Sequence, residues 1–159
     1  MEKAADATLV SDIARDVLAE LAPQEMPIFE AASRAYFADP AAALKQSRSK
    51  DSALGFGVES VVFLTPVVLQ VLSEVCEFLR QVAGKAVEAG LAEEIPQIIK
   101  KMFRKLHSAE PDSPSVLSRE QIALIHGNVL AAAKRLRMPA EKARSLADAV
   151  TSRLVLPSK

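Results

Sequence analysis

The chain has 159 residues, half of them apolar but only 4% aromatic, and its 20 Lys and Arg balance its 20 Asp and Glu. A single cysteine excludes an intramolecular disulfide, and five glycines are too few for the regular turns of an all-β protein. Because good helix formers dominate, we expect an all-α fold, a compact helical bundle of six or seven helices around an aliphatic core.

The N-terminal third predicts three helices. The first runs from Asp6 to Ala22 and ends at Pro23, with Leu9, Val10, Ile13, Val17 and Leu21 at helical spacing. The second is expected from Pro27 to Ala38, with Phe29, Ala32, Tyr36 and Phe37 on its apolar face. Asp39 is placed as the N-cap of a short helix that begins at Pro40 and continues through Leu44. The polar stretch 45–52 has the composition of an exposed linker.

The most apolar stretch is VESVVFLTPVVLQVLSEVCEFL, residues 58–79. Apolar residues at alternating spacings of four and three predict a long central amphipathic helix over 66–89, with Thr65 as its N-cap. The residues expected to face the core are Val68, Leu72, Val75, Leu79, Val82, Ala86 and Ala89. The polar side is expected to carry Gln70, Glu74 and Glu77 in solvent. Residues 60–64 fit either a helical turn or a short extended segment.

A basic amphipathic helix follows, expected to end near His107. Its apolar residues are Ile95, Ile98, Ile99, Met102, Phe103 and Leu106, and its basic ones are Lys100, Lys101, Arg104 and Lys105. The stretch 108–115 contains two prolines and three serines and is a second predicted linker. It divides a helical core, residues 1–107, from a C-terminal helical hairpin, residues 116–159.

The hairpin begins with a capping box at Ser118 and Gln121. Its first helix is expected to end before Pro139, with Ile122, Ile125, Val129, Ala133 and Leu136 facing inward. Its second helix, about 140–155, is expected to bury Ala143, Leu146, Ala147, Val150 and Leu154.

Charge is divided along the chain. Residues 1–99 carry 8 Lys and Arg against 15 Asp and Glu, whereas residues 100–159 carry 12 against 5. Such a chain can pair its own two parts, stack head to tail with copies of itself, or present its basic end to an anionic partner.

No motif in the chain points to catalysis, a cofactor or a metal ion. His107 and His126 are 19 residues apart without other ligands at metal-binding spacing, and Cys76 has no basic neighbour in sequence that would activate its thiol. We therefore expect a protein that is not an enzyme. The acidic N-terminus lacks the features of a signal peptide, which predicts a cytoplasmic location.

Two other functions remain open. The uncharged run 60–73 is shorter than the about 20 apolar residues of a membrane span, but exposure of residues 55–89 on activation would make a membrane-active effector. The basic C-terminal third is also compatible with a small nucleic-acid-binding regulator, although its turn and aromatic content fit poorly.

Three segments together carry a resemblance: LTPVVLQVLSEVCEFL, the following IIKKMFRKL, and LSREQI with AKRLRMPAEKARSLADAV. They resemble small uncharacterised proteins of high-GC bacteria that accompany signalling or protease modules. The resemblance covers about residues 55–155 and implies an accessory or effector role, without any catalytic motif.

The first functional hypothesis is a non-enzymatic helical interaction or assembly protein, a bacterial accessory or adaptor that binds a protein partner or copies of itself. The residues predicted to mediate the interaction are Val68, Leu72, Val75, Leu79, Val82, Lys100, Lys101, Arg104 and Lys105.

Overall fold

The computed structural model describes residues 2–47, 64–90, 94–103 and 117–154. They form α1 (Glu2–Leu21), the 3-10 helix η1 (Pro23–Ile28), α2 (Phe29–Ala38), α3 (Pro40–Ser47), α4 (Leu64–Glu88), α5 (Ile95–Met102), α6 (Arg119–Arg135) and α7 (Ala140–Ser152). In these ranges the only β-type pairing is one antiparallel bridge between Phe103 and Leu154. The predicted all-α fold with a long central helix is confirmed.

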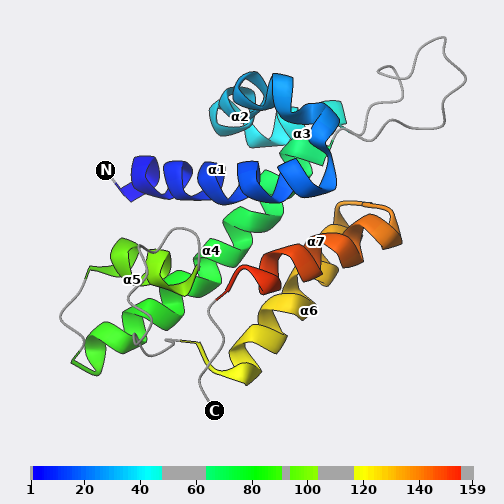
Figure 1. Ribbon diagram of the computed structural model, residues 1–159. Coiled ribbons are helices and arrows are strands. Elements are labelled where there is room, and N and C mark those ends of the chain that lie inside the picture. The colour runs from blue at the N-terminus through cyan, green and yellow to red at the C-terminus, as the bar shows by residue number, and fades with distance from the viewer. Residues whose placement is uncertain (1, 48–63, 91–93, 104–116, 155–159) are drawn as a thin grey trace, which may run out of the picture.

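The other helices pack around α4. Figure 1 shows α4 running diagonally through the molecule, with α1 crossing it and α2 and α3 covering its N-terminal end. The helix α5 packs beside the C-terminal part of α4, and the pair α6 and α7 packs on α4 and α1 respectively. This arrangement brings α4 into contact with α1, α2, α3, α5 and α6.

The first turns of α4 are buried on almost every side. From Leu64 to Leu72 every residue except Gln70 is buried, because α1, α2 and α3 enclose this end. The predicted one-sided helix is therefore correct only for the later turns, where Val75, Leu79 and Val82 are buried and Glu77 is exposed. Beyond them Ala86 is half-buried and Ala89 exposed, so the predicted apolar face continues past the end of the core.

Two N-terminal boundaries differ from the prediction. Residues 23–28 form a 3-10 helix that contains Pro27, and α2 begins only at Phe29. Phe37, expected to face the core, is instead exposed. The N-cap at Asp39 is confirmed, since its carboxylate accepts a hydrogen bond from the Ala42 backbone N–H at 3.2 Å. The helix it caps extends to Ser47, so the predicted linker 45–52 begins inside α3 and its remainder lies outside the described residues.

The basic helix α5 is shorter than predicted. It ends at Met102, and Phe103 adopts an extended backbone conformation that pairs with Leu154 after α7. Both side chains are buried, so the core takes up Phe103 as part of a bridge and not as a further turn of helix. The predicted continuation to His107 falls outside the described residues, as do Arg104, Lys105 and Leu106.

The predicted C-terminal hairpin is confirmed, including the capping box formed by Ser118 and Gln121. The turn after α6 has Arg137 in the left-handed region, with φ of 63°. The Met138 backbone N–H donates to the Ala133 carbonyl and the Arg137 N–H to the Lys134 carbonyl, at 2.9 and 3.0 Å. This is the Schellman pattern, with arginine in the position that glycine usually occupies.

The hairpin shares the core of the rest of the molecule. Ile125 and Val129 of α6 and Leu146 and Val150 of α7 belong to the same buried cluster as the apolar residues of α1 and α4. The boundary predicted between residues 107 and 116 lies outside the described ranges, but α6 packs on α4 and α7 packs on α1 across it.

Candidate interaction site

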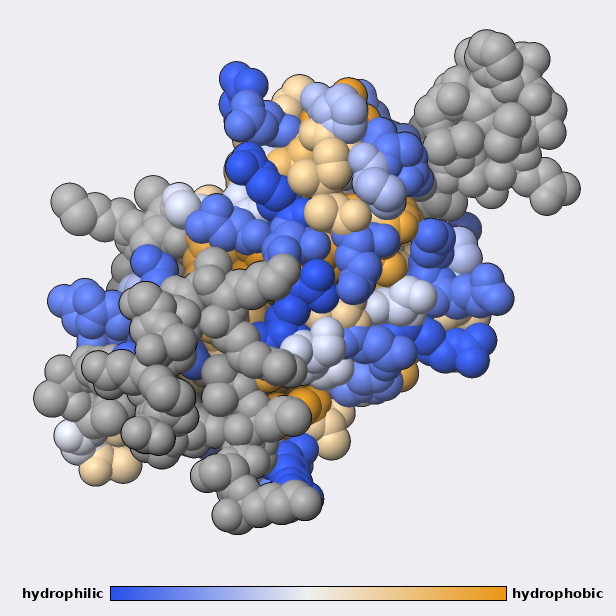
Figure 2. Space-filling model, in the orientation of Figure 1, coloured by the Kyte–Doolittle hydropathy of each residue, from blue (hydrophilic) through white to orange (hydrophobic). Residues whose placement is uncertain are grey.

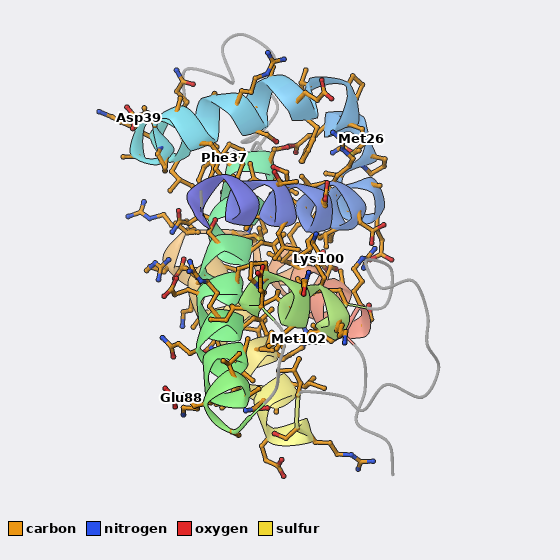
Figure 3. The ribbon with its side chains drawn as sticks, turned by 90° about the vertical axis from the view of Figure 1, so that its left-hand side faces the viewer. Met26, Phe37, Asp39, Glu88, Lys100 and Met102 are labelled. Carbon is orange, nitrogen blue, oxygen red and sulfur yellow. The ribbon has the colours of Figure 1, made fainter. Side chains whose placement is uncertain are left out.

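The predicted interaction residues divide between the core and the surface. Val68, Leu72, Val75, Leu79 and Val82 are all buried against neighbouring helices, so in this conformation they stabilise the fold and form no exposed surface. Lys100 is exposed on α5 and Lys101 is half-buried (Figure 3 labels Lys100). Arg104 and Lys105 lie outside the described residues. The seven described positions therefore do not form one surface.

A buried carboxylate holds the start of α4. Glu25 of η1 is only 7% exposed. It accepts hydrogen bonds from the backbone N–H groups of Leu64 and Thr65, at 2.9 and 2.8 Å, and from the Thr65 hydroxyl at 2.7 Å. The unpaired N–H groups and positive dipole end of a helix favour a negative charge at this position. The prediction that Thr65 is the N-cap is wrong, because α4 already begins at Leu64 and the backbone N–H groups of Leu64 and Thr65 both donate to Glu25.

A chain of polar side chains links α2, α4 and α6. The Tyr36 hydroxyl donates to the Gln70 side-chain carbonyl at 2.6 Å, and the Gln70 amide donates to Glu74 at 3.2 Å. Arg135 of α6 forms a short ion pair with the same Glu74 carboxylate. The residues predicted to form a solvated face, Gln70 and Glu74, thus join three helices.

These contacts shift the pKa values of the groups involved. Burial raises the pKa of the Tyr36 phenol, and the negative charge of Glu74 adds to this effect. Burial also tends to raise the pKa of Glu74, but the hydrogen bonds from Arg135 and Gln70 outweigh it, and the pKa lies below its ordinary value. The contacts with Arg135 and Gln70 thus favour the ionised form of Glu74.

The acidic and basic parts of the chain meet within the molecule. Arg153, after α7, donates from Nε to the Asp16 carboxylate at 2.5 Å and from Nη2 to the Asp16 backbone carbonyl at 3.2 Å. Its other nitrogen lies 3.5 Å from Glu20. Lys142 donates to the Leu21 carbonyl at the end of α1. The charge division allowed pairing within the chain, stacking with copies of the chain, or binding to an anionic partner. These contacts are examples of pairing within the chain.

The histidine and cysteine side chains, which are the other residue types suited to catalysis or metal binding, are held in contacts within the fold. His126 of α6 lies 2.9 Å from Asp148 of α7, and Cys76 is buried in α4. In the described ranges no group of three His, Cys, Asp or Glu side chains is close enough to hold a metal ion. His107 lies outside those ranges.

Large apolar side chains are exposed at four described positions: Ile28, Phe37, Val87 and Leu124. Ile28 directly precedes α2, and Phe37 lies in the last turn of that helix, where Figure 3 labels it. Leu124 lies on α6 and is 55% exposed, more than the other three. None of these was predicted as an interaction residue. Phe37 and Leu124 could have been found from the sequence only by working out which helix face remains uncovered.

Within the described part of the chain, no helix is both long enough and apolar enough to span a bilayer.

Comparisons with family models, curated proteins and solved structures found no match to this chain. The resemblance of residues 55–155 to bacterial accessory proteins therefore stays a prediction.

Proposed function

We propose that this chain is a cytoplasmic, non-enzymatic helical interaction protein that assembles with a protein partner or with copies of itself. The observation that supports this most directly is the outer face of α2. Its opposite face packs on α4 through Phe29, Ser33 and Tyr36, whereas the outer face exposes a row of apolar residues at helical spacing: Ile28, Ala31, Ala35 and Ala38.

The apolar surface continues beyond this row. Ala41 and Ala42 of α3 are also exposed, and Ile28 at the start of the row is 46% exposed. Figure 2 shows light orange residues gathered over α2 and α3 with hydrophilic residues around them. An apolar patch with a polar border is the usual composition of a protein-binding surface, and covering it releases about 25 cal/mol for each Å² removed from water.

The test places charge on this face without breaking its helix. We expect the double substitution Ala31→Arg and Ala35→Arg to abolish cross-linking to a protein partner, because arginine keeps helix propensity but prevents apolar burial. Gln81→Arg, on the exposed side of α4, is the matched control and should cross-link like the original chain. Unchanged cross-linking of the double variant would contradict a role for α2.

A second candidate function, a membrane-active effector, is supported by the burial of Leu64–Leu72 on nearly all sides. Amphipathic helices enclose this segment, so their displacement would expose a strongly apolar helix. The predicted active segment is 55–89, of which 55–63 lies outside the described residues. Anionic vesicles mixed with the chain, before and after cleavage within 45–52 or 108–115, test this candidate. Vesicles that stay sealed and bind no protein would exclude it.

The nucleic-acid alternative has less support. Arg135, Lys142 and Arg153 of the basic third contact acidic side chains or backbone carbonyls of this same chain. Their charge is thereby partly neutralised before any phosphate approaches.

A further inference from the structure

The helix α6 has one face that no other described helix covers. Its inward residues, Ile125, Val129, Ala132 and Ala133, pack toward α4 and α7. The opposite face carries Glu120, Ala123, Leu124, Gly127, Ala131 and Lys134, all of them exposed, with half-buried Leu130 at its border. We call these seven residues the α6 outer face. Two side-chain contacts, from His126 to Asp148 and from Arg135 to Glu74, fix the rotation of α6 about its own axis.

The sequence of the α6 outer face is symmetric about Gly127. Three positions away on either side lie Leu124 and Leu130, and four positions away lie Ala123 and Ala131. Seven positions away lie Glu120 on one side and Lys134 on the other. The two halves of the face therefore carry the same apolar residues in mirrored order and opposite charges at their ends. Positions three, four and seven apart share one side of a helix, so all seven residues can contact one partner helix.

Gly127 has no evident role within a single molecule. A Cβ atom built at this position meets nothing within 4 Å. Glycine inside a helix costs about 1 kcal/mol relative to alanine. Its remaining advantage is that another backbone can approach closely here, and the alanines at 123 and 131 extend the same narrow strip.

We infer that the α6 outer face binds the same face of a second copy of this chain, in an antiparallel pair with its two-fold axis at Gly127. This inference rests on the proposed assembly function and identifies the partner as a second copy of this chain. In an antiparallel pair, residues equally far from the axis in opposite directions face one another. Glu120 of each copy then faces Lys134 of the other. In the same way, Leu124 and Ala123 of each copy lie opposite Leu130 and Ala131 of the other.

Charge selects the antiparallel direction. A parallel pair would place Glu120 against Glu120 and Lys134 against Lys134, which repel. The antiparallel register also brings Arg119 of each copy near Arg135 of the other, two symmetric pairs of like charges at the edges of the face. Arg135 is already paired with Glu74 of its own chain, which reduces this repulsion. A single helix pair buries less than the roughly 1,200 Å² of a standard stable interface, so we expect a reversible dimer with a dissociation constant in the micromolar range.

Charge reversal at the two ends of the face gives the first test, read by sedimentation velocity over a concentration series. Glu120→Lys and Lys134→Glu should each weaken the dimer about tenfold, because each creates two repulsive contacts across the symmetric interface. The two changes together should restore dimerisation close to its original strength. A chain that is monomeric at several hundred micromolar, or a dimer insensitive to both single changes, would overturn the inference.

A disulfide tests the position of the axis. Cα atoms lie about 2.3 Å from a helix axis, so helices about 9–10 Å apart bring the two facing Gly127 Cα atoms within the roughly 4.4–6.8 Å that a disulfide spans. In a Cys76→Ala background, Gly127→Cys should therefore give a covalent dimer on mild oxidation, whereas Ser145→Cys on the exposed side of α7 should not. Equal cross-linking at both positions would overturn the inference. Circular dichroism of each variant confirms that it is folded.

These outcomes are separable from the test of α2. A monomer that still cross-links to a different protein through the α2 face would refute the α6 dimer and retain the interaction function. Loss of both activities would refute both.

Discussion

Glu25 caps α4 although it lies 39 residues before Leu64 in the sequence. A local N-cap can be predicted because Ser, Thr, Asp or Asn stands next to the helix, as Ser118 and Asp39 do here. A cap supplied from another element has no sequence pattern of its own. That is why the capping box of α6 was predicted correctly whereas the start of α4 was assigned to Thr65.

Removal of this cap should have a large effect on stability. We expect Glu25→Ala to lower the free energy of unfolding by about 2–4 kcal/mol, because two buried backbone N–H groups and the Thr65 hydroxyl lose their acceptor. Urea unfolding monitored by circular dichroism measures this change. The control Glu30→Ala removes a carboxylate that is 75% exposed, and should change stability by less than about 0.5 kcal/mol. Equal effects of the two substitutions would contradict the capping role.

Ser33 presents the opposite case. Its hydroxyl is buried in α2, and among the described residues it has no hydrogen-bond partner. We expect Ser33→Ala to raise the free energy of unfolding by about 1 kcal/mol, since it removes an unsatisfied polar group and improves helix propensity. Ser73→Ala is a useful comparison because the Ser73 hydroxyl donates to the Leu69 carbonyl at 2.8 Å. A loss of stability on Ser33→Ala would show that the hydroxyl has a partner after all.

Glu74 should make stability depend on pH. Its pKa is lower in the folded chain than in the unfolded one, so the stabilisation is fully present above the unfolded value of about 4.5. It is lost as pH falls through the lower folded value. Chemical unfolding between pH 6 and pH 3 should therefore show a smaller acid-induced loss in Glu74→Gln than in the original chain. Parallel pH profiles for the two chains would contradict this account.

At the scale of elements, the apolar periodicity was sufficient to predict most helices, because local spacing determines which residues a helix buries. It failed where tertiary contacts decide. Phe103 continues the apolar pattern of α5, yet it leaves the helix to pair with Leu154. Phe37 fits the pattern of α2, yet it is not buried and remains 37% exposed. The candidate interaction surfaces were missed for the same reason, since periodicity shows which residues can be buried but not which helix faces remain free.

The turn between α6 and α7 offers a test at this scale. Arg137 has a positive φ that glycine adopts without steric cost. We expect Arg137→Gly to raise the free energy of unfolding by up to about 1 kcal/mol, after the greater flexibility of glycine in the unfolded chain is subtracted. Arg137→Val should lower it, because a β-branched side chain is more strongly disfavoured there. Thermal unfolding of the three chains gives the order directly.

At the scale of the whole molecule, the division of charge that the sequence revealed is partly resolved by contacts between its acidic and basic parts. Arg153 and Lys142 attach α7 to α1, and Arg135 attaches α6 to α4. The sequence indicated that the two parts attract one another but not which residues pair, because that depends on how the helices cross.

The strength of the attachment at Arg153 can be measured by a double-mutant cycle. Arg153→Gln should lower the free energy of unfolding by about 1.5–3 kcal/mol, since this arginine is largely buried and donates to both the side chain and backbone of Asp16. Asp16→Asn should lower the free energy of unfolding less in the Arg153→Gln variant than in the original chain. The difference, a coupling energy, should be about 1 kcal/mol. Strict additivity of the two substitutions would show that the contact contributes nothing to stability.

The contact between Asp16 and Arg153 joins residues that are 137 positions apart. During synthesis, α1 is made first, but the arginine that pairs with its acidic side is added only when almost all of the described chain has been made. Because α1 also packs on α4, it can dock there as soon as α4 is made, and only its contact with α7 has to wait for the last residues. Until then the side of α1 that α7 later covers is available to other partners, such as a folding helper that binds amphipathic helices.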